Sequence, residues 1–453
     1  MRMTPSATPA RRHQVRVAIV GSGIAGLAAA HTLQGLADVT LFEADDVFGG
    51  HTRTLDVALP DASGAPLNVG LDAGFLVLDE RTSPNLLALF TQLGVPLAAS
   101  DGSFSVQVRG TGLAWGSANL AGVFSQRRHL ASPRFWRMLA DARRFKHACA
   151  VLTRQHAETG PDTPLLQPLG DYLREHHFSS GFRDDCLLPL LTGFWGCSPD
   201  EVLLAPLLAA SRFLRQHTPL RVGGRSRWFT VMGGARPFVQ AIVAGIGDAR
   251  RSTPVHHVAR DAQGVRIVTG SQVERFDAVV LACHADQALG LLGEEAGEEE
   301  RATLGAIRFQ PRRAVLHTDT SVLPAARDAW AAWNCEPGGL HCLLNRTQPL
   351  PVAQPVLVSF GTPRAIAPER VLGTFDLAHP VFDLAAIRAQ AQLPALQGGH
   401  HTWYAGAWCG DGFHEDGLKA GLHAARALID RFDLVPRISD QRALRQALPG
   451  VLA

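Results

Sequence analysis

Six residues near the start of the chain, Gly21-Ser22-Gly23-Ile24-Ala25-Gly26, lie between a β-branched run and a run of helix formers. Residues 15–20 are expected to form a buried parallel strand, residues 25–36 a helix and residues 39–42 a second strand. In such a unit the first glycine permits a tight turn, the second lets the backbone approach a diphosphate, and the third allows close packing of helix and strand. The helix amino end then faces the phosphate charge. The sequence therefore predicts a Rossmann-type dinucleotide-binding unit.

Glu43 stands at the end of the second expected strand. An acid at this position accepts hydrogen bonds from the ribose hydroxyls of a dinucleotide, which argues against the 2′-phosphate of NADP. The alternative is a solvated glutamate beside an ordinary turn. Because NAD and FAD share this fingerprint, the choice between them depends on the residues that follow.

Residues 43–54, EADDVFGGHTRT, resemble the second dinucleotide signature of the flavin amine oxidase superfamily. In that family a Gly-Gly-Arg sequence and a nearby hydroxyl contact the diphosphate. Here His51 replaces the arginine, so we expect Arg53 to neutralise part of the phosphate charge. The resemblance implies FAD as the cofactor. Across both motifs, the expected cofactor contacts are Gly21, Gly23, Ile24, Ala25, Gly26, Glu43, Ala44, Gly49, Gly50, His51 and Thr52.

Two later segments are similar to other motifs of the same superfamily. Asp72-Ala73-Gly74-Phe75 resembles its flavin-side motif, a strand under the isoalloxazine ring, although a plain turn also explains this sequence. Residues 403–421 resemble its closing FAD motif, in which a helix amino end faces the flavin edge that gains negative charge on reduction. Together with the strand expected at 255–259, these segments add the contacts Gly74, Phe75, Val258, Gly406, Glu415, Gly417 and Leu418.

The order of the expected elements indicates an α/β fold. It comprises a discontinuous Rossmann-type FAD-binding domain and a second, mixed α+β substrate domain. The predicted division is a disordered leader at 1–14, the FAD-binding domain at 15–79, 226–299 and 400–432, the substrate domain at 80–225 and 300–399, and a C-terminal extension at 433–453. Within the FAD-binding domain we expect a helix after Gly233-Gly234 to residue 246, strands at 265–268, 278–282 and 402–405, and a helix at 415–432.

Five short segments favour a narrower resemblance. Residues 283–289, 316–319, 329–334, 343–348 and 412–421 look like those of bacterial flavin amine oxidase-like proteins encoded beside cyclopropane-fatty-acid synthases. They are also similar to the oxidase-like part of the plant synthases. This resemblance implies a lipid acyl chain as substrate and a lipid methyltransferase as partner.

The chain lacks two reactive groups that amine oxidases carry. Their lysine near flavin N5 corresponds to the stretch 310–313, which reads Gln-Pro-Arg-Arg, and the only lysines are Lys146 and Lys419. Their cysteine for covalent attachment precedes the last strand, whereas no cysteine lies between Cys342 and Cys409. We therefore expect non-covalent FAD and chemistry other than amine oxidation.

Three residues are candidates for a part in catalysis. Phe413 falls where amine oxidases place one wall of an aromatic cage, and a phenyl ring suits an alkyl chain equally well. His414 and His379 are candidates for proton handling. Core packing explains Phe413 as readily, and a lone histidine is more often a hydrogen-bonded structural residue.

Composition excludes several other classes of function. Lys+Arg of 43 and Asp+Glu of 41 nearly cancel, which gives no reason to expect a nucleic-acid partner. The seven cysteines include no CxxC pair, so neither a disulfide framework nor a metal site is expected, and a reducing, cytoplasmic location fits. No run approaches the roughly 18 apolar residues of a membrane span. Residues 132–155 form a basic amphipathic helix that either packs on the core or rests on an anionic membrane.

The leading hypothesis is an FAD-dependent oxidoreductase acting on an apolar substrate. It would oxidise, desaturate or isomerise a lipid acyl chain by hydride transfer to flavin N5. One alternative is oxidation of an amine or a tetrapyrrole-like ring. The other is a non-catalytic FAD-binding partner of a lipid methyltransferase.

Overall fold

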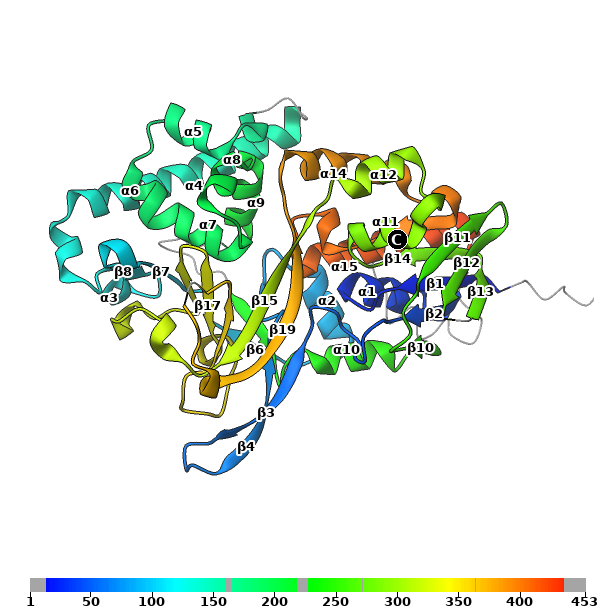
Figure 1. Cartoon of the computed structure of the whole chain (residues 1–453), viewed down its shortest axis with the longest axis horizontal. Coiled ribbons are helices and arrows are strands. Elements are labelled where there is room, and N and C mark those ends of the chain that lie inside the picture. Colours follow the sequence, from blue (N-terminus) through cyan, green and yellow to red (C-terminus); the bar gives the residue numbers. More distant parts are fainter. Residues whose placement is uncertain (1–13, 160–163, 218–226, 271, 363, 436–453) are drawn as a thin grey trace, which may run out of the picture.

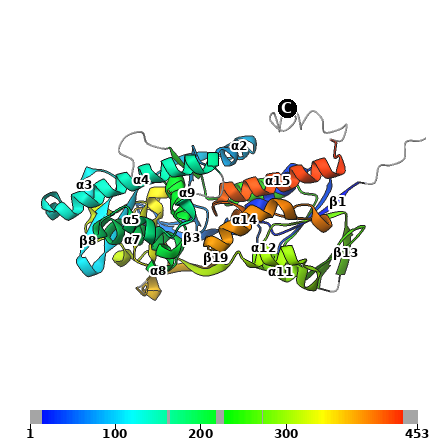
Figure 2. The ribbon, with the colours of Figure 1, turned by 90° about the horizontal axis from the view of Figure 1, so that it is seen from above.

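A computed structural model describes residues 14–159, 164–217, 227–270, 272–362 and 364–435. Nearly all of the leader expected at 1–14, and most of the extension expected at 433–453, lie outside these ranges. The described chain is a mixed α/β protein with an elongated outline (Figures 1 and 2). Its division into a cofactor domain and a substrate domain with the expected boundaries stays a prediction.

A five-stranded parallel sheet forms one half of the molecule. Its strand order is β10-β2-β1-β14-β20. The strands are β1 (Arg16–Val20), β2 (Asp38–Phe42), β10 (Asp248–Arg250), β14 (Ala278–Leu281) and β20 (Thr402–Tyr404). Apart from β10, each of these strands was expected from the sequence, because buried apolar runs are typical of parallel strands covered on both faces.

Helices cover one face of this sheet. They are α1 (Ile24–Leu33), α2 (Pro84–Gln92), α10 (Arg236–Val243) and α15 (His414–Phe432). Val17 and Ile19 of β1 point to this face, whereas Ala18 and Val20 point to the other. The helices α1 and α15 pack so closely that a Cβ at Gly421 would lie 2.1 Å from the carbonyl oxygen of Ala25. Glycine is therefore required at this crossing.

The opposite face carries a small antiparallel sheet and three helices. The strands are β11 (His257–Asp261), β12 (Gly264–Thr269) and β13 (Gln272–Phe276), and the helices are α11 (Ala285–Leu292), α12 (Glu298–Gly305) and α14 (Leu384–Leu396). Expected helix ends were less accurate than expected strands. The helix α1 ends at Leu33 rather than 36 and α10 at Val243 rather than 246, because glycines follow both helices, with Gly35 at φ +75°.

A seven-stranded mixed sheet forms the other half, in the order β19-β15-β18-β17-β16-β7-β8. Its strands are β7 (Phe104–Val108), β8 (Leu113–Gly116), β15 (Phe309–His317), β16 (Trp333–Glu336), β17 (Gly339–Leu343), β18 (Leu357–Phe360) and β19 (Val371–Pro380). The long strands β15 and β19 pair antiparallel between the two halves (Figure 1).

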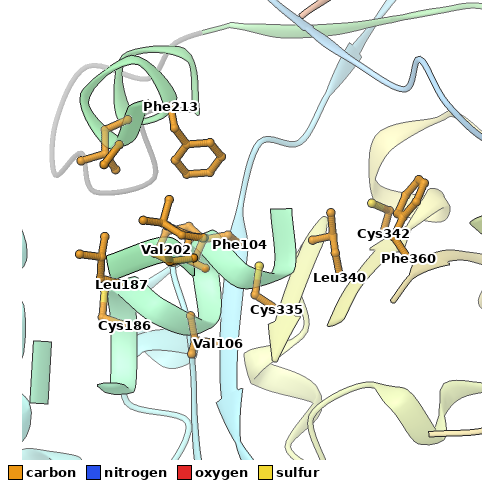
Figure 3. Packing of buried hydrophobic residues seen from close by; sticks show 14 of the residues in the cluster. Phe104, Val106, Cys186, Leu187, Val202, Phe213, Cys335, Leu340, Cys342 and Phe360 are labelled. Carbon is orange, nitrogen blue, oxygen red and sulfur yellow. The ribbon is translucent and has the colours of Figure 1, made fainter. Parts of the chain in front are cut away.

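Helices from the middle of the chain pack beside this sheet. They are α3 (Leu120–Val123), α4 (Pro133–Thr159), α5 (Leu169–Glu175), α6 (Ser180–Phe182), α7 (Leu188–Trp195), α8 (Pro199–Leu204) and α9 (Leu207–His217), and a short α13 (Leu344–Thr347) follows β17. Figure 3 shows side chains from distant segments in one cluster, among them Phe104, Val202, Cys335 and Phe360. This shared core fixes α7 against the sheet.

Two small antiparallel units are separate from the larger sheets. One is a hairpin of β3 (Thr54–Pro60) and β4 (Pro66–Asp72), which projects from the body in Figure 1. The other joins β5 (Leu78–Asp79) and β6 (Leu97–Ser100) to β9 (Trp228–Val231). The motif expected to run as a strand through Gly74 and Phe75 leaves regular structure at Asp72. There the buried carboxylate accepts hydrogen bonds from the Ala235 backbone N–H and the Gln348 side chain.

The basic amphipathic helix expected at 132–155 is the major part of α4. Its apolar stripe is buried in the core of this half, at Phe135, Met138, Ala142, Phe145 and Cys149. This observation favours core packing for the stripe. Among the described residues, no helix is both long enough and apolar enough to cross a bilayer.

Candidate cofactor and substrate site

A cavity of about 1170 Å³ extends from the carboxyl ends of β1 and β2 to the seven-stranded sheet. Its volume is above the range of about 300–1,000 Å³ that is typical of ligand pockets. Of the expected cofactor and catalytic residues, those that line it are Gly21, Gly23, Ile24, Ala25, Glu43, Ala44, Gly49, Gly50, His51, Gly74, Phe75, His379, Gly406, Phe413, His414 and Glu415. Segments hundreds of residues apart thus meet on one cavity wall.

The glycine loop has the geometry that its sequence predicts. Gly21 has φ +102°, and a Cβ there would lie 2.7 Å from the Ala282 carbonyl oxygen. A Cβ at Gly26 would lie 1.9 Å from the Gly21 carbonyl oxygen, whereas one at Gly23 would meet no protein atom within 4 Å. Gly21 and Gly26 are therefore required by the turn itself. Gly23 faces the open cavity and leaves space for a ligand.

Glu43 is buried and joins the loop to the end of β2. Its Oε2 accepts hydrogen bonds from the Ser22 backbone N–H (3.0 Å) and hydroxyl, and its Oε1 accepts one from the Asp45 N–H (2.9 Å). Since each carboxylate oxygen has two lone pairs and Oε1 uses one, Oε1 can still accept one hydrogen bond from a ribose hydroxyl at the cavity surface. The carboxylate also stabilises the loop, which the motif alone does not reveal.

The segment after Glu43 curls over the glycine loop. Gly49 and Gly50 both have positive φ, and a Cβ at Gly50 would lie 3.1 Å from the Gly23 Cα. The side chain of His51 contacts the Ala378 carbonyl oxygen through Nε2 (3.1 Å). Burial and the neighbouring His284 lower the pKa of His51 to about 4, so the ring is neutral at pH 7. Arg53 also lines the cavity, but its guanidinium forms an ion pair with Asp45.

The closing motif lines the cavity with residues at the start of α15, among them Glu415. Glu415 is buried, and its Oε1 accepts hydrogen bonds from the backbone N–H (3.1 Å) and side-chain Nδ2 (2.6 Å) of Asn85. Its Oε2 accepts from the Leu86 N–H (3.0 Å). These bonds tie the first turn of α2 to the start of α15. The carboxylate therefore orders the cavity wall in addition to facing it.

Five expected cofactor contacts are placed elsewhere, namely Gly26, Thr52, Val258, Gly417 and Leu418, none of which lines the cavity. Val258 and Leu418 are fully buried in the hydrophobic cores on the two faces of the parallel sheet. Gly417 packs against α1, where a Cβ would lie 2.7 Å from Cγ2 of Ile24. The structure thus gives these three residues packing contacts with protein.

Five histidines line the cavity. They are His51, His256, His284, His379 and His414. The ring centroid of His51 lies 5.9 Å from that of His284 and 5.4 Å from that of His379. No sequence spacing indicated His284, which stacks on Phe309 at 4.2 Å.

The two histidines expected to handle protons are both neutral at physiological pH. Burial is the main cause that lowers the pKa values of His379 and His414 to about 3, and the neighbouring imidazole of His51 lowers them further. His414 lies 4.4 Å from Phe75 between ring centroids, and its Nε2 is 3.5 Å from the Thr52 hydroxyl. A group with so low a pKa is a weak general base at pH 7, which favours hydrogen bonding as its role.

The end of the cavity nearest the seven-stranded sheet is mainly apolar. The side chains there include Phe194, Trp333, Leu340, Phe360 and Phe413, together with the buried guanidinium of Arg312. A second hollow of about 290 Å³ adjoins this end and shares Phe194, His379 and Phe413 with it. Apart from Phe413, sequence reasoning missed this wall, because its other residues come from the inserted segments and carry no local motif.

Neither lysine of the chain is among the residues that line the cavity. Lys146 is on α4, and Lys419 on α15 lies 3.8 Å from the Glu415 carboxylate. The position expected to match the amine oxidase lysine is occupied by β15, which presents Arg312 to the cavity.

Residues 24–317 match the family described as "Flavin containing amine oxidoreductase". Over 272 residues the chain is 30% identical to AofH of Mycobacterium tuberculosis, a protein provisionally named as a flavin-containing monoamine oxidase. The match covers 58% of this chain and 51% of the relative. The chain thus spans about half the length of the curated relatives it matches.

Two solved structures share the fold over almost the whole chain. Cyclohexylamine oxidase from Brevibacterium oxydans IH-35A superposes with a TM-score of 0.70 at 18% identity, covering 93% of this chain and 100% of that one. A fatty acid isomerase from P. acnes that produces CLA superposes with a TM-score of 0.66 at 15% identity, covering 92% and 98%. At such identities the likeness concerns the fold alone.

Proposed function

Because this chain belongs to the flavin containing amine oxidoreductase family and has FAD as its cofactor, we propose that it is an oxidoreductase acting on an apolar substrate, a lipid acyl chain. The reaction would be oxidation, desaturation or double-bond isomerisation. Bound FAD would supply the two-electron acceptor for a hydride from a substrate C–H bond. The residues of the cavity bind and orient both molecules.

The residues present fit FAD. Gly23 leaves open space beside the loop, which suits a backbone that must approach a diphosphate. The Glu43 carboxylate suits a ribose, and the start of α15 suits the flavin edge. Gly74, Phe75 and Gly406 lie along the same wall. We propose that these groups hold FAD with its flavin ring toward the apolar end of the cavity.

Attachment of FAD is proposed to be non-covalent. Cys283 lines the cavity, but burial raises the pKa of its thiol to about 12, so the nucleophilic thiolate is scarce at neutral pH. Acid or heat should therefore release intact FAD from a yellow protein. A flavin that stays on a peptide after denaturation would contradict this part of the proposal.

The apolar wall beside the seven-stranded sheet is the observation that carries the proposed substrate class. Phe194, Trp333, Leu340 and Phe360 surround this end, and each methylene buried against them contributes about 0.8 kcal/mol to binding. An extended hydrocarbon would bury many methylenes against this surface. Phe413 lines both this cavity and the adjoining hollow. There its phenyl ring would pack against an alkyl chain.

Charge at this end weighs against an amine substrate. Asp376 on the neighbouring strand β19 lines the cavity. Its side chain is 78% exposed and already forms an ion pair with Arg313. The buried charge at this end is the positive Arg312. A protonated amine would lose its hydration there and meet repulsion, which costs free energy.

The test is anaerobic mixing of the FAD-loaded protein with lipids and with amines. Unsaturated and saturated fatty acids, phospholipid vesicles, cyclohexylamine and putrescine are compared by flavin absorbance. Lipid products are examined by mass spectrometry, because a redox-neutral isomerisation leaves no net bleaching. We expect bleaching, or a shifted double bond, with a lipid and no change with the amines.

Two outcomes would overturn the proposal. Rapid bleaching by an amine, with no response to any lipid, would assign amine oxidation instead. Tight FAD binding with neither bleaching nor product from any of these compounds would favour the non-catalytic partner function. Co-purification with a lipid methyltransferase would then be the next measurement.

A further inference from the structure

Arg312 is a buried cation without an acidic partner. It lies on β15 and is 8% exposed. Its two terminal nitrogens donate hydrogen bonds to the carbonyl oxygens of Gly193 and Phe194, in the last turn of α7. Its Nε has no hydrogen-bond partner, and none of the ion pairs among the described residues includes it. Three of its five N–H groups are thus left for a ligand.

The carbonyl groups of α7 compensate only part of this charge. A helix carboxyl end carries the equivalent of about half a negative charge. Burial lowers the pKa of Arg312 to about 10, so the guanidinium still carries its proton at pH 7. Buried charges in proteins are normally paired with an opposite charge, because the desolvation cost is otherwise uncompensated. An anionic group in the cavity would supply that charge.

The position of Arg312 makes this charge available to a ligand. The side chain lines the cavity, and its guanidinium carbon lies 5.2 Å from the ring centroid of Phe360. Leu377 is opposite Arg312 in the β15–β19 register, and His379 is opposite Gln310. Residues two apart share a face, so Arg312 and His379 point to the same side of the sheet. The buried Nδ1 of His379 also has no hydrogen-bond partner.

We propose that Arg312, assisted by His379, binds the carboxylate of the substrate, so that the substrate is a free carboxylic acid with a long apolar chain. The inference rests on the proposed function and narrows its lipid substrate from acyl chains in general to unesterified ones. A guanidinium binds a carboxylate through two parallel hydrogen bonds, which fixes the orientation of the chain as well as its position.

The surroundings offer the chain of such an acid an apolar path. The adjoining hollow shares His379 with the main cavity and is lined by Phe194, Trp195, Phe213 and Phe382. Its acids are already engaged: Asp411 pairs with Arg212, Asp383 pairs with Arg308, and Glu201 accepts hydrogen bonds from Ser198. An acid held at Arg312 therefore has hydrophobic surface beside it, and Arg312 is the buried cation next to that surface.

The test measures binding, which needs no turnover. Dodecanoate, methyl dodecanoate and dodecylamine have the same chain length and differ in the charge of the head group. Each is titrated into the anaerobic FAD-loaded protein, and its dissociation constant is measured by calorimetry. We expect the acid to bind at least about tenfold more tightly than the ester, as for a hydrogen bond to a charged group, and the amine to bind most weakly.

Substitutions test whether Arg312 causes the preference for the acid over the ester. Arg312→Gln should weaken binding of the acid by about tenfold or more and leave the ester unchanged. Arg312→Lys should restore part of the preference, since it keeps the charge without the two-bond geometry. The matched control is Arg313→Gln, because Arg313 is the next residue on β15, is exposed and pairs with Asp376. This control should bind the acid and the ester as the wild type does.

The outcomes separate this inference from the proposed function. Equal binding of acid and ester by the wild type overturns the inference, even if Arg312→Gln fails to fold and even if lipid oxidation is observed. Binding of the acid that depends on Arg312, without flavin bleaching or product from any lipid, leaves the carboxylate site standing and removes the proposed chemistry.

Discussion

The Glu415 carboxylate accepts a hydrogen bond from the backbone N–H of Leu86 at 3.0 Å, although 329 positions separate the two residues. Ser83, at the N-cap of α2, makes no side-chain capping bond, so the acid from α15 performs that task. A negative charge is favourable at a helix amino end. One buried carboxylate therefore couples the cavity wall to the stability of α2.

Replacing this acid should destabilise the protein. Glu415→Gln removes the charge and leaves one acceptor oxygen for the N–H groups of Asn85 and Leu86. We expect the free energy of unfolding to fall by about 1–3 kcal/mol. Urea unfolding of the FAD-loaded protein measures the loss, with Asp430→Asn on the exposed face of the same helix as the control. Equal midpoints for the two variants would contradict the capping role.

The glycine loop predicts opposite behaviour for two alanine substitutions. Gly26→Ala would place Cβ 1.9 Å from a backbone oxygen, so we expect a loss of about 3 kcal/mol or more of folding stability. Gly23→Ala meets no protein atom and should leave the thermal midpoint of the FAD-free protein unchanged. Its Cβ projects toward the cavity, so FAD affinity should fall about tenfold or more. Normal FAD binding by Gly23→Ala would show that the diphosphate lies elsewhere.

Removal of the expected ribose partner should weaken cofactor retention. Glu43→Ala deletes an acceptor for the ribose hydroxyls and the carboxylate that holds Ser22. Hydrogen bonds to a charged group contribute about 1.5–3 kcal/mol, which corresponds to at least about a tenfold rise in the dissociation constant of FAD. Fluorescence titration of the FAD-free protein measures it. The exposed Asp46→Ala is the control, and similar affinities in both variants would refute the assignment.

A buried ion pair beneath the parallel sheet should make stability depend on pH. Glu300 contacts Arg260 at 2.6 Å and accepts a hydrogen bond from the Tyr404 hydroxyl. Burial alone would raise the pKa of Glu300, but Arg260, Tyr404 and the Gly297 N–H together lower it to about 2, against 4.5 for an ordinary glutamate. Because the folded-state pKa is depressed, the stabilisation is complete above about pH 4.5 and is lost as the pH falls toward 2.

Glu300→Gln tests this pH dependence. At pH 7 it leaves Arg260 buried without its partner, so we expect a loss of about 3–5 kcal/mol in the free energy of unfolding. The difference from wild type should shrink as the pH falls below 4.5. Unfolding curves between pH 7 and pH 3 measure this, with the exposed neighbour Glu299→Gln as the control. A difference that does not vary with pH would exclude the ion pair as its source.

Much of the cofactor end was predictable because its signals are local. The strand, turn, helix and acid between residues 15 and 43 are consecutive. Each element favours particular residue types, such as β-branched residues in the strand and glycines in the turn. The positive φ of Gly21 and the close approach at Gly26 follow directly from that order. The short strand β10 and helix ends such as Leu33 were missed, since tertiary contacts decide whether marginal segments pair or continue.

The substrate end was not predictable in the same way. Arg312 reads in the sequence as one of two adjacent arginines, and no pattern distinguishes it from Arg313. The pairing of β15 with β19 turns Arg312 into the cavity and Arg313 toward solvent, where it meets Asp376. A one-residue shift in that register would exchange their roles.

The amino-acid sequence by itself determined the family, the nucleotide fold and most of the residues around the glycine loop. The family was indicated by the resemblance of whole motifs, whereas the fold and the loop residues depend on backbone freedom and on the periodicity of neighbouring residues. Only the tertiary structure decided that Glu415 caps α2, that five histidines share one cavity, and that a buried arginine faces an apolar wall. Such contacts join segments up to hundreds of residues apart, and their partners are fixed by strand register and helix packing rather than by any local pattern.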